Sequence, residues 1–81
     1  MGMLRVMSKR GDDKVAWDIA KAEIGDPEAV AAVKEAERIF REESARGATA
    51  FKVELDETTV RIDRFDPTAK QIVMVPRVVG G

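Results

Sequence analysis

The strongest structural signal in the sequence is a long amphipathic helix that spans about Asp26 to Arg46. Asp26 can accept a hydrogen bond from the first free N–H groups, and Pro27 suits the first helical position. Gly47 can adopt the left-handed conformation that often follows a helix. Apolar residues recur at helical spacing on one side of this segment, namely Ala29, Ala32, Val33, Ala36, Ile39 and Phe40. Only one face of the helix is apolar, so the helix must be buried against another element, and its alanines allow a sheet to approach closely.

The period of the apolar residues changes from 3.6 to 2 after Gly47, which indicates strands. The stretches "ATAFKVEL" and "TTVRIDRF" alternate in this way, and the short polar "DET" between them suits a hairpin. The side chains expected on the helix-facing side are Phe51, Val53, Leu55, Val60 and Ile62. Phe40 is then expected to pack against Phe51, Val53 and Ile62. Asp66 and Pro67 predict a turn before the last strand.

The last strand, "QIVMV", is apolar on both faces. We assign Ile72 and Met74 to the face that the helix covers, which leaves Val73 and Val75 on the other face, where we also expect Trp17. One helix covers one face of a sheet, so the N-terminal segment, a second copy of the chain or a partner must cover the other. Pro76 ends the ladder, and a mobile tail is expected after it, formed by Arg77, Val78, Val79, Gly80 and Gly81.

The first 25 residues fit two interpretations, and the difference lies in residues 14–24. As strands, "MLRVMSKR" and "KVAWDIA" flank a turn at Gly11-Asp12-Asp13. As a helix, Asp12 or Asp13 caps the start and Gly25 closes the end. Strong helix formers in "AKAE" favour the helix, but tertiary context often overrides such preferences. Both interpretations stay open at this point.

These patterns predict one domain over residues 1–81, with a folded core over about 3–76 and a tail over 77–81. The predicted class is α+β, with one long helix packed on a small antiparallel or mixed sheet. The fold is β-grasp-like if the N-terminus forms a hairpin.

The composition argues against most enzyme chemistry. The chain has no cysteine and no histidine, so thiolate nucleophiles, thiolate metal ligands and the most common general base are all missing. We therefore predict no catalytic residues, no metal site and no cofactor. The net charge of -1 argues against nucleic acid as a partner, and no apolar stretch reaches the ~20 residues of a membrane span. The start has no apolar h-region, so the expected location is the cytoplasm.

With an N-terminal hairpin, the element order and the terminal Gly80-Gly81 resemble the β-grasp fold of ubiquitin and of the small sulfur-carrier proteins. In those families the terminal glycine carboxylate is adenylated and then passed on as a thioester or thiocarboxylate. The resemblance implies that Gly81 carries the reacting carboxyl group, that Gly80 gives clearance, and that Arg77 to Val79 give reach. It also implies an activating enzyme as a partner.

A second resemblance is to short proteins of bacterial, phage and plasmid genomes. It rests on Trp17-Asp18, on "DPEAV" before the helix, on "FDP" at residues 65–67, and on "IVMVP" followed by two glycines. Those proteins carry no established activity, and they begin close to their Trp-Asp pair.

Two functional hypotheses follow. The first is a small non-catalytic interaction module that binds a protein partner or forms a homo-oligomer, such as a dimer, through Trp17, Val73 and Val75. The alternative is a ubiquitin-like modifier or sulfur carrier that acts through its Gly-Gly carboxylate.

Overall fold

The N-terminal segment forms a hairpin of two antiparallel strands, β1 (Gly2–Ser8) and β2 (Gly11–Trp17). The computed structural model describes residues 1–8 and 11–77. In the register of the hairpin Gly2 lies opposite Trp17 and Ser8 opposite Gly11. The turn predicted at Gly11-Asp12-Asp13 is therefore wrong, because these three residues belong to the second strand.

The segment of residues 14–24, which the sequence left open between strand and helix, contains both. Strand β2 continues to Trp17, and the Asp18 carboxylate then accepts a hydrogen bond from Lys21 N to begin the short helix α1 (Ile19–Glu23). Gly25 adopts a φ of +85°, a left-handed conformation in which a side chain would be strained. The strong helix formers of "AKAE" thus form a short helix, which begins only after strand β2 has ended.

The long helix α2 (Pro27–Ala45) confirms the predicted element and both of its ends. The Asp26 carboxylate accepts a hydrogen bond from Ala29 N at 3.1 Å, and Gly47 has a φ of +96° after the C-cap Arg46. The apolar side of α2 buries Ala29, Ala36 and Phe40, as the periodicity predicted.

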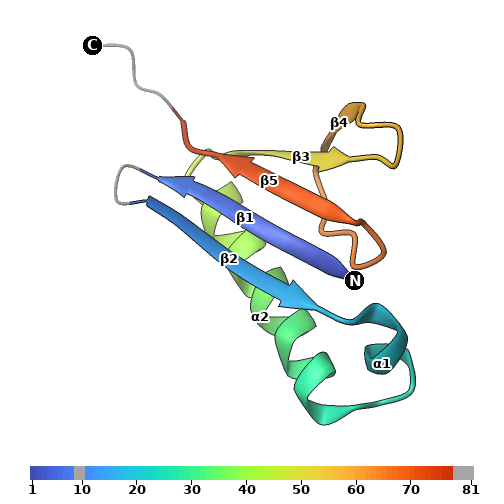
Figure 1. Cartoon of the computed structure of the whole chain (residues 1–81). Helices are drawn as coiled ribbons and strands as arrows, with labels where there is room; N and C mark the ends of the chain where they lie inside the picture. The colour runs from blue at the N-terminus through green and yellow to red at the C-terminus, as the bar shows by residue number, and fades with distance from the viewer. Residues whose placement is uncertain (9–10, 78–81) are drawn as a thin grey trace.

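Three further strands complete the sheet, β3 (Thr49–Val53), β4 (Thr59–Ile62) and β5 (Gln71–Val75). The strand order is β2-β1-β5-β3-β4. Strand β1 pairs with β5 in parallel, and the other neighbours are antiparallel. The fold is therefore α+β, with one long helix packed on a mixed sheet, and the N-terminal hairpin makes it β-grasp-like (Figure 1). Within the described ranges, neither helix is both long and apolar enough to cross a membrane.

The core lies between α2 and one face of the sheet. Its buried residues come from every part of the chain: Leu4, Val6, Trp17, Ala36, Phe40, Ala50, Ala69, Ile72 and Met74. The ring of Phe65, from the connection between β4 and β5, lies between Trp17 and Phe40, with centroid distances of 5.4 and 5.9 Å. The Trp17 indole Nε1 donates to the Pro67 carbonyl oxygen at 2.9 Å.

Trp17 corrects the expectation that it lies on the face away from the helix. Its side chain is only 2% exposed and belongs to the core. The register places it there, because Trp17 pairs with Gly2, which alternates along β1 with the buried Leu4 and Val6, and Gly2 lacks the Cβ atom that would block the ring. A Cβ on Gly2 would lie 2.3 Å from a ring atom of Trp17, so the indole occupies the space that a side chain would need.

The facing of β3 is also a correction. Ala50, not Phe51, points to the helix, with an exposed fraction of 3%, and it lies opposite Met74. Phe51 and Val53 therefore lie on the other face. Leu55 is 84% exposed in the turn. Ile62 packs on the core as predicted, but the aromatic partner of Phe40 is Phe65 and not Phe51.

Candidate interaction surface

The sheet has one face that α2 does not cover, and we call it the open face. Strand alternation defines it, because Ile72 and Met74 are fully buried toward the helix and Val73, between them, points the opposite way. In Figure 1 the helix α2 lies behind the sheet, so this face is turned toward the viewer. The described open-face side chains are Met3, Arg5, Met7, Lys14, Ala16, Thr49, Phe51, Val53, Thr59, Arg61, Gln71, Val73 and Val75.

Two of the three interaction residues expected from the sequence lie on the open face. Val73 is half-buried at its centre, and Val75 is 36% exposed toward the end of β5. Trp17, the third, lies in the core. The two valines and Trp17 are thus separated by the sheet, and Trp17 cannot contribute to a surface centred on Val73.

One row of side chains crosses the open face from edge to edge. From β2 through β1, β5 and β3 to β4, the aligned residues of this row are Lys14, Arg5, Val73, Phe51 and Arg61. The outer strands β2 and β4 therefore contribute the cations Lys14 and Arg61, β1 contributes Arg5, and the inner strands β5 and β3 contribute the apolar Val73 and Phe51. The neighbouring rows add Met3, Val53, Met7 and Val75, which widen the apolar centre.

The arginines on the outer side of α2 are arranged differently, because they pair with glutamates of the same helix. Arg38 bonds to Glu42 at 2.9 Å and also to Glu35, and Arg41 lies 3.2 Å from Glu37. The hydrogen bond from Arg38 holds the pKa of the Glu35 carboxyl below its usual value. Such i,i+3 and i,i+4 pairs are typical of a solvated helix surface.

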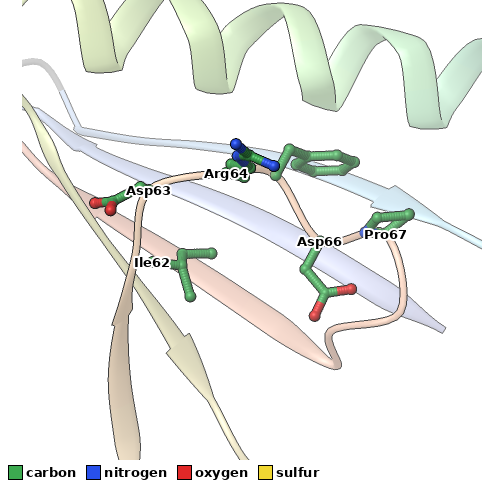
Figure 2. A pocket seen from close by; sticks show the side chains of 6 residues that line it. Ile62, Asp63, Arg64, Asp66 and Pro67 are labelled. Carbon is green, nitrogen blue, oxygen red and sulfur yellow. The ribbon is translucent and has the colours of Figure 1, made fainter.

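A shallow depression of about 440 Å³ lies along the connection after β4 and is lined by residues 62–67 (Figure 2). Figure 2 shows the carboxylates of Asp63 and Asp66 pointing in different directions, so they do not converge on a common substrate position. Asp66 instead fixes the local chain. Its carboxylate accepts hydrogen bonds from Thr68 N at 2.9 Å and from Lys52 Nζ at 3.2 Å.

The environment of Asp66 also lowers its pKa, chiefly through the hydrogen bond from the Thr68 hydroxyl. A carboxylate with a lowered pKa is a weak proton acceptor at neutral pH. We therefore interpret Asp66 as a residue that shapes the turn predicted at Asp66-Pro67, and we do not assign it to a reaction.

The C-terminal residues leave the sheet after Val75. Pro76 and Arg77 are exposed, and the aliphatic part of Arg77 lies over Gly47, where an added Cβ would be 3.1 Å from Arg77 Cδ. The remaining residues of the predicted tail, Val78, Val79, Gly80 and Gly81, lie outside the described residues.

Sequence reasoning missed Phe51 and the cations that flank the apolar centre. It placed Phe51 and Ile62 on the same face of the hairpin, whereas Phe51 lies opposite Arg61 and Ile62 opposite Ala50. The loop decides this register: Glu54 N bonds to Thr58 O at 2.8 Å, and Glu57 has a φ of 68°. A three-residue loop with a left-handed residue at its third position is a common hairpin type, and recognising it would have located Phe51 correctly.

Comparison with known proteins adds no assignment to this geometry. The chain matches no protein-family model, no curated protein and no solved structure at a significant level. The resemblances suggested by the sequence motifs and by Gly80-Gly81 stay predictions, and the open face is the feature from which a function can be inferred.

Proposed function

We propose that this protein is a small interaction module that binds a protein partner through the open face of its sheet. The observation that carries the proposal is the position of Val73. It is an apolar residue at the centre of the face that α2 leaves uncovered, next to Phe51 in the same row. When a partner covers apolar side chains, the binding free energy becomes more favourable by about 25 cal/mol for each Å² of apolar surface removed from water.

The size of the open face suggests a transient interaction. The sheet has five strands, so its width is roughly 19 Å at the usual strand spacing of about 4.8 Å. The strands have four to seven residues each and lengths of roughly 13–24 Å, with a mean near 19 Å. The projected area is therefore on the order of 360 Å², compared with about 800 Å² per partner in a stable interface of standard size. A face of this size suits a short segment of a partner better than a permanent subunit contact.

Site-specific photocrosslinking tests this proposal. Val73 would be replaced by a photoreactive phenylalanine derivative in cells of the natural source, and crosslinked proteins would be identified by mass spectrometry. The matched control is Val60, a valine of the same sheet that is 46% exposed on the other side of its strand. We expect a discrete crosslinked protein from position 73 and not from position 60. Equal labelling from both positions, or none from 73, would contradict the proposal.

The fold supports a second candidate function, a modifier that acts through the Gly-Gly carboxylate. The specific observation is the position of β5, the last strand, which lies in the centre of the sheet and parallel to β1 and is followed by the exposed Pro76 and Arg77. The N-terminal strand that this resemblance requires is present. In this proposal the partner is an activating enzyme, and Gly81 carries the reacting carboxyl group.

Deletion of Gly81 tests the modifier proposal. A protein tagged at its N-terminus should form higher-mass conjugates or a C-terminal thiocarboxylate in the natural source, and loss of Gly81 should abolish them. Circular dichroism should show that the shortened protein keeps its fold, because the described sheet ends at Val75. Absence of both products from the intact chain would argue against a modifier and would leave the interaction proposal unaffected.

A further inference from the structure

We infer that the partner segment is acidic: an extended peptide whose central residues are apolar and whose two ends carry carboxylates. This inference rests on the proposed function of the open face and specifies its ligand. The structure assigns the apolar centre of the peptide to Val73 and Phe51, and the two carboxylates to Lys14 on β2 and Arg61 on β4.

The charges of the open face carry the inference. By register, the described open-face side chains include three basic residues, Arg5, Lys14 and Arg61. Arg5 is itself engaged in an interaction, so the argument uses only Lys14 and Arg61. Within the described residues, neither of these two takes part in an ion pair, whereas Arg38, Arg41 and Arg46 on α2 are each paired with a glutamate. The protein carries a net charge of -1, so this basic face is a local feature.

The geometry specifies the length of the peptide. Lys14 and Arg61 lie on the two outer strands, which are separated by four strand spacings, or roughly 19 Å. An extended chain advances about 3.3 Å per residue, so about six residues span this distance. The carboxylates are thus expected five to seven positions apart, with apolar side chains between them.

A second copy of the chain fits the open face poorly. In a two-fold symmetric contact the same patch lies on both sides, so the cations of one copy would meet those of the other around the apolar centre. Like charges in such positions repel, and the projected area is well below that of a stable interface. The inference therefore departs from the symmetric dimer that the sequence suggested.

Single-stranded nucleic acid is the other anionic candidate, and two observations favour a peptide. Lys14 and Arg61 stand at the two margins of the sheet with Val73 and Phe51 between them, so they do not form the continuous cationic groove that follows a phosphate backbone. Phe51 is the one aromatic side chain among the described open-face positions, so successive bases would have no series of rings on which to stack.

The experiment starts with selection from a random dodecapeptide phage library on the immobilised full-length protein. We expect enriched peptides to contain Asp or Glu at positions five to seven apart, with Leu, Ile, Val or Phe between them. The most enriched peptide would then be synthesised and its affinity measured by calorimetry. Because exposed charges are screened by salt, its affinity should fall as the salt concentration rises.

Variants distinguish this inference from the proposed function. Lys14→Glu and Arg61→Glu should each weaken peptide binding by about 3- to 10-fold. Lys34→Glu, the same charge change at an exposed position of α2, should leave it unchanged. If Val73→Lys abolishes binding but the two charge variants do not weaken it, the acidic-peptide inference fails and the interaction module survives. If no peptide is enriched, or if Val73→Lys has no effect on binding, both fail.

Two further measurements can overturn the inference in favour of another occupant. Binding of the oligonucleotide (dT)20 at physiological salt, lost in Arg61→Glu, would identify the face as a nucleic-acid surface. A dimer detected by light scattering and lost in Val73→Lys would identify a second copy. A monomer that does not bind (dT)20 and selects acidic peptides is the result that supports the inference.

Discussion

At the scale of single residues, the contact between Gly2 and Trp17 shows how one missing side chain makes room for a large residue in the core. The Trp17 ring lies over Gly2, and its Nε1 is hydrogen-bonded to Pro67 O. The ring is thus held on the helix side of the sheet and cannot move aside for a new side chain. Trp17 is therefore a core residue, although the sequence predicted it on the face away from the helix with Val73 and Val75.

Gly2→Ala is therefore expected to lower the free energy of unfolding by about 1–3 kcal/mol, the usual range for overpacking a core. Chemical denaturation measures this change. The control is the double variant Gly2→Ala with Trp17→Phe, in which the smaller ring leaves room for the methyl group. The effects of the two substitutions should be non-additive, with the alanine less destabilising beside phenylalanine. Additive effects would show that the methyl group and the ring do not compete for the same space.

At the scale of elements, the loop between β3 and β4 determines which side chains form the open face. Glu57 has a φ of 68°, in the region that glycine adopts most readily. Its position in the three-residue loop places Phe51 opposite Arg61 and Ala50 opposite Ile62. A change of this register by one residue would turn β4 over, so that Arg61 would leave the open face and Ile62 would enter it.

Glu57→Gly is expected to stabilise the protein by about 0.5–1 kcal/mol, because it relieves the strain of a non-glycine residue in the left-handed region. This gain exceeds the backbone entropy that the glycine loses on folding. Thermal unfolding should show a rise in Tm of a few degrees. The matched control is Glu57→Ala, which removes the same carboxylate and keeps the strain. If alanine stabilises as much as glycine, the charge at position 57 and not its backbone conformation is responsible.

A second element-scale prediction concerns the aromatic contact between α2 and the connection after β4. Phe40 meets Phe65 edge-on at a centroid distance of 5.9 Å, whereas Phe51 lies on the other face of the sheet. Phe40→Ala should cost about 3–5 kcal/mol. In a double-mutant cycle with leucine substitutions, Phe40 and Phe65 should couple by about 0.5–1.5 kcal/mol. Phe40 and Phe51 should show no coupling, and a coupling between them would contradict the observed facing of β3.

At the scale of the whole molecule, the first and the last strand lie side by side in the middle of the sheet, because β1 pairs with β5. The long connection back to β5 is tied to the sheet through Asp66, which bonds to Thr68 and, from β3, to Lys52. These hydrogen bonds lower the pKa of Asp66, first through the Thr68 hydroxyl and then through Lys52. Folding stability is thereby linked to the ionisation of this carboxylate.

The sign of the pH dependence follows from the direction of this pKa shift. A carboxylate with a lower pKa in the folded state contributes stability above its ordinary pKa of about 3.9 and loses it as pH falls through the folded value. Stability should therefore change little between about pH 6 and 8, where the chain has no histidine or cysteine to titrate, and should fall below about pH 4. Urea denaturation at several pH values measures both the nearly constant stability between about pH 6 and 8 and its loss below about pH 4.

The variant Asp66→Asn serves as the control for this prediction. It should be less stable than the natural protein at pH 7 by about 1 kcal/mol, the typical net contribution of a hydrogen bond, and the difference should disappear in acid. A difference of the same size at pH 2 would mean that the ionised carboxylate of Asp66 does not account for its contribution to stability. A steep change between pH 6 and 8 would reveal another strongly perturbed group.

The sequence by itself determined the features that depend on neighbouring residues. Asp26, Pro27 and Gly47 marked both ends of α2, and helical periodicity identified its buried side. The consecutive apolar residues of β5 predicted a strand with apolar side chains on both faces. The prediction that Ile72 faces the helix and Val73 faces away from it was correct. Caps and periodicity are local signals, so one stretch of chain contains all the information that they need.

Only the tertiary structure decided the features that depend on pairing between distant segments. The division of residues 14–24 at Asp18 follows from the pairing of β2 with β1 up to Trp17, and the burial of Trp17 follows from Gly2 across the hairpin. The row that joins Lys14, Val73 and Arg61 exists because four separate strand pairings align these residues. A shift of one residue in any register moves every side chain of a strand to the opposite face, and the alternation within a single strand carries no information about its partner.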